Sequence, residues 1–356
     1  MNRRRFLTVL PALAAAHCSR TDSPPNDRRP DPAAQAAAPP RETASPIKMN
    51  VALAPGVLCL ISWIIAGEKD FFSAEGLDVD FFERDLSGGH LHGWNSVWVR
   101  GPSGLLRNDA MVVEYPVLQD MASGAMDYYI VAGEHSGCRQ LVVPVGSSIR
   151  SVAELRGRRV GLRPTEDTLM WEFLIGSPRP GAEPTRFVHP SFPSGDPREV
   201  QWVTEQFAAN QIAAYGGADP VPEILIADGV ARRLASNTWT PPLNGWYCCM
   251  LALRKELVDT FPDLPHRFTR AMRAAASFVE KNPAEAVALV VSKGHFPPST
   301  RQDLSARLLG EYVWTTTGRI QEDLERYFQL LIDAGRIPAT TPPSELVKRV
   351  YRGAEA

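Results

Sequence analysis

Beyond its opening segment, the sequence has no apolar run that approaches the roughly 20 residues needed to cross a bilayer as a helix. It also lacks a basic helix, and its 40 Asp and Glu residues outnumber its 38 Lys and Arg residues. Nucleic acid phosphates bind clustered positive charge, so we expect no nucleic acid partner. Both absences point away from membrane-spanning and nucleic-acid-binding proteins.

The common catalytic motifs are absent as well. The sequence has no G-x-S-x-G turn, no H-E-x-x-H pair, no Walker loop and no G-x-G-x-x-G segment after a strand. It has no C-x-x-C pair either, so its five cysteines do not follow zinc-finger spacing. We therefore expect a protein that is not an enzyme and that needs no cofactor.

What the chain does contain is the composition of a globular protein. Of its 356 residues, 44% are hydrophobic and 22% are charged. This length suffices for two domains or for two lobes of one fold. The first 48 residues carry eight Lys or Arg and four Asp or Glu, so the rest of the chain has a charge of −6 within the total of −2.

Residues 1–18 have the layout of an export signal, with a basic start, a short apolar run and small residues near its end. The order Arg-Arg-x-Phe-Leu from Arg3 to Leu7 resembles the twin-arginine type, which predicts a periplasmic location. At Cys18 two alternatives stay open: lipid attachment, although His17 departs from the lipoprotein pattern, or cleavage a few residues earlier. Residues 19–48 are rich in Pro, Ala and charge, which predicts a disordered tether.

The remaining sequence alternates between strand and helix patterns. Apolar spacing predicts strands at 48–55, 77–84, 128–133, 139–147, 158–164, 212–217 and 246–253. It predicts helices at 58–76, 114–127, 151–156, 165–175, 198–211, 265–283, 284–293, 299–313, 320–334 and 343–352. Residues 86–112 are rich in glycine and predict a long loop or a short hairpin. Strand–helix–strand order of this kind predicts a parallel sheet in an α/β fold.

Four stretches, in this order, also carry a resemblance to a known family. They are AGEKDFFSAEGLDVDFF, LQDMASGAMDYYIV, SVAELRGRRVGL and LALRKELVDTFPDLPHRFTRAMRAAASFVEKNPAEAVAL. They resemble the solute-binding proteins of ABC importers in the NMT1/THI5-like group, which handles nitrate, sulfonates, taurine and pyrimidine precursors of thiamine. The resemblance extends over most of residues 50–290.

The resemblance implies a two-lobed type II periplasmic-binding-protein fold with crossover strands and a C-terminal helical extension. We expect lobe 1 at 49–160 plus 246–356, and lobe 2 at 161–245. The ligand would bind in the cleft between the lobes, which close around it by a hinge motion. The partners implied are a small-molecule ligand and an ABC permease with its ATPase, and we expect a monomer.

Four loops are expected to face this cleft, at 54–59, 133–138, 163–168 and 244–250. Hydroxyl and backbone donors there would bind an anion at helix N-termini, and the candidates are Gly56, Ser136, Thr165 and Thr168. The alternative is that these residues serve only as turn and cap residues. Trp246 and Tyr247 are the candidates for the cleft walls.

Three of these loops contain cysteine: Cys59, Cys138, and the adjacent Cys248 and Cys249. Thiolates select thiophilic metals, so Cys59, Cys138 and Cys248 form a candidate site for such an ion or an organometallic ligand. His135 would add a further ligand and Glu134 would orient it.

Two other interpretations of these thiols stay open. They are apolar thiols in the core, or a disulfide such as Cys59–Cys138 in an oxidising compartment. Side chains alternate along a strand, so only one of the vicinal pair is expected to face the cleft, and we favour Cys248.

Three further alternatives complete the interpretation. His90 and His92, two residues apart, form either a metal site or part of a solvated loop. Some relatives of the group form pyrimidines in thiamine synthesis with a cysteine-rich segment, which YCCM resembles faintly. A protein that senses its ligand without transporting it has the same architecture.

Overall fold

The computed structural model describes residues 45–53, 57–83, 98–102, 104–163, 168–176, 183–191, 198–314 and 319–353. All of them belong to one compact unit, residues 45–356. The export signal, Cys18, the tether up to residue 44, Gly56, His90, His92 and Thr165 lie outside the described residues, so the predictions for them stay predictions.

The first of two five-stranded sheets has the order β2-β1-β5-β12-β6. Its strands are β1 (Ile47–Leu53), β2 (Leu77–Glu83), β5 (Ala110–Val113), β6 (Tyr128–His135) and β12 (Cys249–Arg254). β1 pairs in parallel with β2 and with β5, whereas β12 runs antiparallel to both β5 and β6. The predicted parallel start therefore continues into a mixed sheet, in which β12 lies antiparallel between β5 and β6.

The second sheet has the order β11-β7-β10-β8-β9. Its strands are β7 (Arg139–Pro144), β8 (Arg159–Leu162), β9 (Arg186–Val188), β10 (Ala214–Ala218) and β11 (Ala231–Ser236). β8 pairs in parallel with β9 and β10, and β7 pairs antiparallel with β10 and β11. A separate hairpin joins β3 (Trp98–Gly101) to β4 (Gly104–Arg107), inside the segment predicted to be a loop or a hairpin.

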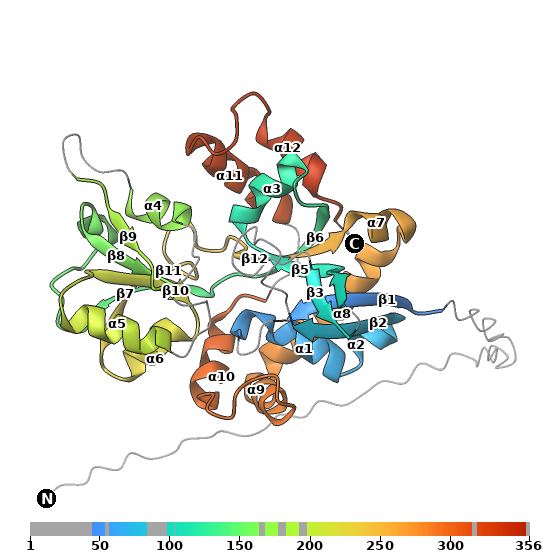
Figure 1. Ribbon diagram of the computed structural model, residues 1–356, viewed down its shortest axis with the longest axis horizontal. Helices are drawn as coiled ribbons and strands as arrows, with labels where there is room; N and C mark the ends of the chain where they lie inside the picture. Colours follow the sequence, from blue (N-terminus) through green and yellow to red (C-terminus); the bar gives the residue numbers. More distant parts are fainter. Residues whose placement is uncertain are drawn as a thin grey trace, which may run out of the picture. The chain divides into compact units, whose positions relative to one another are not determined.

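Helices cover both faces of the first sheet (Figure 1). One face packs against η1 (Leu58–Leu60), α1 (Ile61–Glu68), α2 (Phe71–Ala74), α8 (Leu264–Lys281), α9 (Pro283–Ser292) and α10 (Gln302–Glu311). The other packs against η2 (Tyr115–Val117), α3 (Leu118–Ser123), α11 (Ile320–Asp333) and α12 (Pro343–Val350). The short α7 (Lys255–Thr260) follows β12.

The second sheet has its own smaller apolar core. Helices α5 (Arg198–Ala208) and α6 (Val221–Ala227) pack on one side of it, and η3 (Val152–Leu155) and α4 (Leu169–Ile175) complete this part of the chain. Among the described helices, none combines the length and apolar character that crossing a membrane requires.

The chain changes sheet between His135, the end of β6, and Arg139, the start of β7. The sequence prediction assigned 139–160 to the first lobe. The structure instead pairs β7 with β10 and β11, which makes β7 an antiparallel strand of the second sheet. The return lies between β11 and β12, a stretch that includes position 246. Which residues move together as lobes stays a prediction.

Ion pairs join the second-sheet helix α6 to helix α10 of the first-sheet side. The buried Glu223 carboxylate accepts hydrogen bonds from Arg307, at 2.6 Å, and from Arg233 of β11. Burial alone would raise the pKa of the Glu223 carboxyl, but the bonds from Arg307 and Arg233 outweigh it and hold this pKa below its ordinary value. The charged carboxylate therefore stabilises the contact between the two sides.

We expect Glu223→Ala to lower the free energy of unfolding by about 1.5–3 kcal/mol at neutral pH, because it removes hydrogen bonds between charged groups. Since the folded pKa is lowered, this stabilisation is complete above the unfolded carboxyl pKa of about 4.3 and is lost as the pH falls through the folded value. Urea unfolding between pH 7 and pH 3 measures it. Glu311→Ala is the matched control, because Glu311 pairs with the same two arginines at 3.1 and 3.5 Å but is about one-third exposed. Equal losses in the two variants, or a loss independent of pH, would contradict the prediction.

Candidate functional site

Four cysteines and one histidine meet where the chain changes sheet. Cys59 lies in η1, Cys138 in the link from β6 to β7, and Cys248 and Cys249 at the entry to β12. His135 ends β6. All five side chains are buried, and the four thiols in the described residues are free.

The distances within this cluster are short. One ligand atom from each of Cys59, His135, Cys138 and Cys249 lies within 4.8 Å of the others. The Sγ atom of Cys138 lies 3.9 Å from that of Cys249 and 3.1 Å from that of Cys248. The Sγ atom of Cys248 lies 3.7 Å from Nδ1 of His135. The structure therefore brings together the three predicted metal-ligating cysteines and adds Cys249.

Local backbone irregularities place both vicinal thiols beside Cys138. β12 begins at Cys249, so Cys248 lies in the preceding bend and the alternation of a strand does not separate the pair. Cys249 and Met250 of β12 pair with His135 and Gly133 of β6. Glu134 between them has no partner in β12 and is the extra residue of a β-bulge. Both Cys248 and Cys249 lie in the same apolar core, which differs from the prediction that one faces a cleft and the other the core.

Aromatic rings cover His135. The imidazole stacks on Tyr312, with centroids 4.9 Å apart, and tilts against Trp314 at 5.0 Å. α10 ends at Glu311, and the backbone of Val313 then exchanges two hydrogen bonds of 3.1 Å with Ser136. The sequence prediction continued this helix to 313 and did not identify either ring as part of the site.

Glu134 does not orient His135 in the way predicted. Its Oε1 atom accepts hydrogen bonds from Ser62 Oγ at 2.6 Å and from Trp63 Nε1 at 2.9 Å, both in α1. Burial raises the pKa of the Glu134 carboxyl to about 7. The residue therefore ties β6 to α1 directly beside the thiol cluster.

The electrostatics of the cluster favour a thiolate at Cys59. Hydrogen bonds from Cys138 and Cys249 hold the pKa of the Cys59 thiol well below its ordinary value, although burial opposes this. A thiolate is both the nucleophilic and the metal-binding form of cysteine. The cluster can thus offer an anionic sulfur within an apolar core.

A second polar network lies against the cluster on the side of the second sheet. The buried Asp219 carboxylate accepts hydrogen bonds from Gln140 Nε2 at 2.6 Å and from Tyr312 Oη at 3.1 Å. Burial raises the pKa of this carboxyl well above its ordinary value. Asp219 thus links the end of β10 to the ring that covers His135.

Trp246 and Tyr247 occupy the return connection between the sheets. Trp246 is half-buried and packs edge-on against Tyr327 at 5.1 Å and near Phe173 of α4 at 6.3 Å. Tyr247 is buried; its N–H donates to Asp323 at 3.1 Å and its carbonyl accepts from Tyr327 Oη at 2.7 Å. Trp246 contacts helices of both sides, whereas Tyr247 is part of the packed interior.

Thr168 is half-buried at the N-terminus of α4 and makes no side-chain capping hydrogen bond. Its carbonyl accepts from Glu172 N–H. Near the start of the same helix, Met170 N–H donates to Tyr115 Oη at 2.9 Å. The structure does not bring Thr168 into the thiol cluster.

Gly133 lies directly against Tyr247. A Cβ atom at Gly133 would overlap the tyrosine ring. We expect Gly133→Ala to lower the free energy of unfolding by about 1–3 kcal/mol, because the buried ring has to move and shift the backbone that carries Cys248. Gly146→Ala is the control, since a Cβ there meets no atom within 4 Å. Urea unfolding of both variants measures the difference, and equal stabilities would show that the ring moves without cost.

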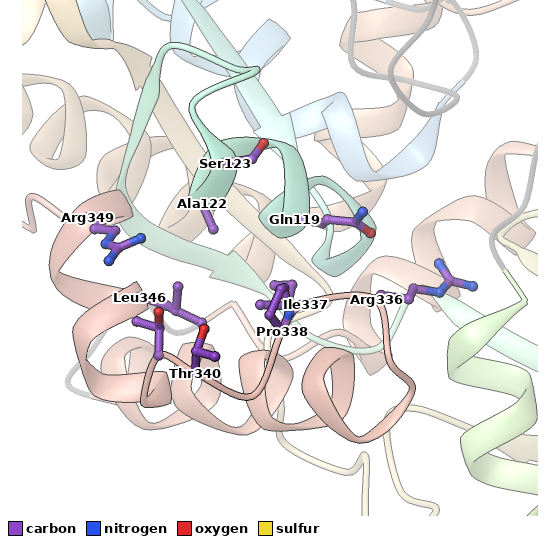
Figure 2. Close-up of a pocket in the computed structure, with 10 residues that line it drawn as sticks. Gln119, Ala122, Ser123, Arg336, Ile337, Pro338, Thr340, Leu346 and Arg349 are labelled. Atoms are coloured by element: carbon purple, nitrogen blue, oxygen red, sulfur yellow. The ribbon is translucent and has the colours of Figure 1, made fainter.

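A pocket of about 290 Å³ lies elsewhere, between α3 and the segment from α11 to α12 (Figure 2). Gln119, Ser123, Thr340, Arg336 and Arg349 are among its lining residues. None of the predicted site residues lines it.

No protein-family model and no curated protein matches the sequence. The structure is similar to that of the alkanesulfonate-binding protein SsuA from Xanthomonas axonopodis pv. citri bound to MOPS, with a TM-score of 0.62 and 16% identity over 87% of this chain and 100% of that one. The periplasmic nitrate-binding protein NrtA from Synechocystis PCC 6803 gives a TM-score of 0.60 and 15% identity over 87% and 86% of the two chains. The desulfurization enzyme DSZB gives 0.59 and 14% over 86% and 97%.

The chain has the periplasmic binding protein fold. This confirms the predicted fold class, with two sheets joined by crossing segments and helices at the C-terminal end. In this periplasmic binding protein fold, Cys138 lies in one crossing segment and Trp246, Tyr247 and Cys248 lie in the other. The similar structures include binding proteins and one enzyme, so the fold accommodates both activities.

Proposed function

We propose that this protein is the solute-binding component of an ABC-type importer. It captures a small ligand between the parts of the chain built on the two sheets and delivers it to a membrane permease. The relatives in structure are described as binding proteins for an alkanesulfonate and for nitrate, so a small anion is the first ligand class to test. A heterocycle is the second.

The observation that carries this proposal is the position of the predicted ligand residues. Ser136 lies in the first crossing segment, and Trp246 lies in the second. In α/β folds of this kind, ligands bind where segments cross between the two halves, because closure there surrounds the ligand.

Trp246 supports a ligand-dependent closure. It is half-buried, and its ring meets Phe173 from α4, whose own ring is 38% exposed. α4 belongs to the second-sheet side, while Tyr327, the other partner of Trp246, belongs to α11 on the first-sheet side. A hinge motion between the sides would change the surroundings of this indole and therefore its fluorescence.

The proposal includes the place of action. The export signal at 1–18 would direct the protein to the periplasm, with or without a lipid anchor at Cys18, and the permease and its ATPase would lie in the inner membrane. Ligand capture in this scheme involves no covalent step. The enzyme alternative is kept as an outcome of the test, because one similar structure is a desulfurization enzyme.

Native mass spectrometry of the protein isolated from its own periplasm tests the proposal. We expect a small non-covalent ligand in addition to the mass of the chain. Returning that ligand to ligand-free protein should change the fluorescence of Trp246, with Trp239→Phe as a background control and Trp246→Phe as the variant that loses the signal. The liganded protein, but not the free one, should stimulate the ATPase of its partner permease.

Three outcomes would overturn the proposal. The first is a protein that carries no small molecule and responds to no alkanesulfonate, nitrate or pyrimidine. The second is a bound molecule that is chemically converted, which indicates an enzyme. The third is a response to ligand without ATPase stimulation, which indicates a sensor.

A further inference from the structure

We propose that Cys59, His135, Cys138 and Cys249 form a closed tetrahedral site for one thiophilic metal ion, Zn²⁺ or Cu⁺, which is a resident part of the protein and not its transported ligand. The site lies at the point where the chain leaves the first sheet. It is independent of which solute the protein binds.

The donor set has the chemistry of a structural metal site. Three thiolates and one imidazole form a Cys₃His set, which is one of the common combinations for structural zinc, and thiolates also select Cu⁺. All four side chains are at most 6% exposed. Four protein ligands complete a tetrahedron and leave no open position for a substrate.

The spacing of the donors fits a single ion. Metal–sulfur bonds of about 2.3 Å at tetrahedral angles place two sulfur atoms about 3.8 Å apart. The Sγ atoms of Cys138 and Cys249 lie 3.9 Å apart, and all four ligand atoms lie within 4.8 Å of one another. In a [4Fe–4S] cluster each thiolate binds a different iron atom, and in a [2Fe–2S] cluster two pairs of thiolates bind two iron atoms, so the four ligands spread farther apart than around one ion.

The same geometry selects Cys249 over its neighbour. The Sγ atom of Cys248 lies only 3.1 Å from that of Cys138, which is too close for two thiolates on one tetrahedral ion. Cys248 instead contacts Nδ1 and the carbonyl oxygen of His135, at 3.7 and 3.4 Å. Its place is beside the metal ligands and not among them.

A second observation points to a missing partner at this place. Within the described part of the chain, His135 Nε2 and Glu134 Oε2 are buried and make no hydrogen bond. A buried polar atom without a partner costs free energy, and native proteins usually satisfy it or bind something there. Tyr312 and Trp314 fix the plane of the His135 ring, which prepares it to bind an ion without rotation.

Burial separates this site from the transport site. Cys59 in η1, His135 in β6 and Cys249 in β12 belong to the first-sheet side, whereas Cys138 lies between the sheets, one residue before β7. The carbonyl oxygen of Cys138 accepts from Asp219 N–H at 3.0 Å, which holds this ligand to the end of β10. All four ligand side chains are buried, so the site is closed to a transported ligand.

Binding releases protons, because each coordinating thiol must become a thiolate while the imidazole binds as the neutral ring. The ion takes up no electrons, and the only bonds that break are the S–H bonds, whose protons pass to solvent. We therefore expect metal affinity to weaken as the pH falls, by a larger factor than a single thiol would give.

Metal analysis of the full-length exported protein, purified without chelators and without oxygen, tests the site. We expect about one zinc or copper per chain. Metal-free protein should then regain one equivalent of Zn²⁺ or of Cu⁺, and the two additions show which ion binds more tightly. Addition of Co²⁺ should produce the intense thiolate-to-cobalt absorption of a tetrahedral site, a readout that needs no variant.

The adjacent cysteines supply a matched pair of variants. Cys249→Ser should lose at least tenfold in metal affinity, and Cys59→Ser should do the same from a different segment. Cys248→Ser should keep the affinity of the wild type. Circular dichroism and cooperative unfolding show which variants fold. If Cys249→Ser does not fold, the cobalt spectrum of the wild-type protein decides whether the metal site exists.

Wild-type protein that binds neither ion and gives no thiolate–cobalt absorption would overturn the inference. So would a metal site lost in Cys248→Ser and kept in Cys249→Ser. These outcomes are separate from those for solute binding, because ligand-dependent Trp246 fluorescence and ATPase stimulation do not measure metal content. A protein that holds the ion and binds no solute would contradict only the proposed function.

Discussion

Replacing Asp109 with alanine should lower the free energy of unfolding by about 3 kcal/mol, because the change removes a charged hydrogen bond to Arg254 and leaves the N–H of Asn50 without its acceptor. Asp109 is 3% exposed and precedes β5. Its Oδ2 atom accepts from the N–H of Asn50 in β1 at 2.8 Å, and its Oδ1 atom accepts from Nε of Arg254 at the end of β12 at 2.8 Å. One carboxylate therefore joins three neighbouring strands at one end of the first sheet.

The control for Asp109 uses the same arginine. Glu256 also pairs with Arg254, but its side chain is 74% exposed and water screens the pair. Glu256→Ala should change the free energy of unfolding by no more than about 0.5 kcal/mol. Urea unfolding at neutral pH measures the loss in each variant. The slope of the unfolding free energy against urea concentration should stay the same in both. Similar small losses in both variants would mean that Asp109 contributes only a surface ion pair.

The elements that the sequence predicts well are those whose buried face is set by local spacing. In α8, the apolar spacing predicts one face made of Phe268, Ala271, Met272, Ala275 and Phe278. The first four are buried in the core of the first sheet, and Phe278 packs against that core half-buried. In β1, alternate residues are buried, as a strand with one well-covered face requires. Such patterns do not depend on distant parts of the chain.

The sequence prediction missed two kinds of element. One is a strand with charged residues in its middle, and the other is a helix too short to show an apolar period. β11 contains Arg232 and Arg233, which suggests a loop. Their charges are satisfied by partners far along the chain, the Ile149 carbonyl oxygen for Arg232 and Gln140 Oε1 for Arg233. β11 pairs with β7 and is therefore a strand only because of tertiary contacts.

The candidate site was predictable in its residue types and not in its geometry. The sequence predicted the cysteines and His135 on loops at the ends of strands, and in the structure they lie where the chain changes sheet. The spacing within the cluster depends on the extra residue Glu134 in β6 and on the end of α10 at Glu311, which brings Tyr312 over the imidazole. Both are long-range effects, since neither follows from the residues on either side.

Removal of the proposed metal ion should reduce the stability of the folded chain substantially. A ligand that binds the folded state alone contributes about 4 kcal/mol when its concentration is 1,000 times its dissociation constant. The proposed ligands come from three segments far apart in sequence, around residues 59, 135–138 and 249, so the unfolded chain cannot hold them around one ion. We expect a strong chelator to lower the unfolding midpoint and added Zn²⁺ or Cu⁺ to restore it.

The cysteine variants make this prediction specific to the four ligands. In Cys248→Ser the chelator should destabilise the protein as it does the wild type, because Cys248 lies beside the site. In Cys59→Ser and Cys249→Ser the metal and the chelator should change the unfolding midpoint less than in the wild type, because the tetrahedral set has lost one ligand. Mg²⁺, which prefers oxygen ligands, should not replace Zn²⁺ in any of them. An unfolding midpoint that the chelator does not change in the metal-loaded wild type would mean that these thiols only fill the core.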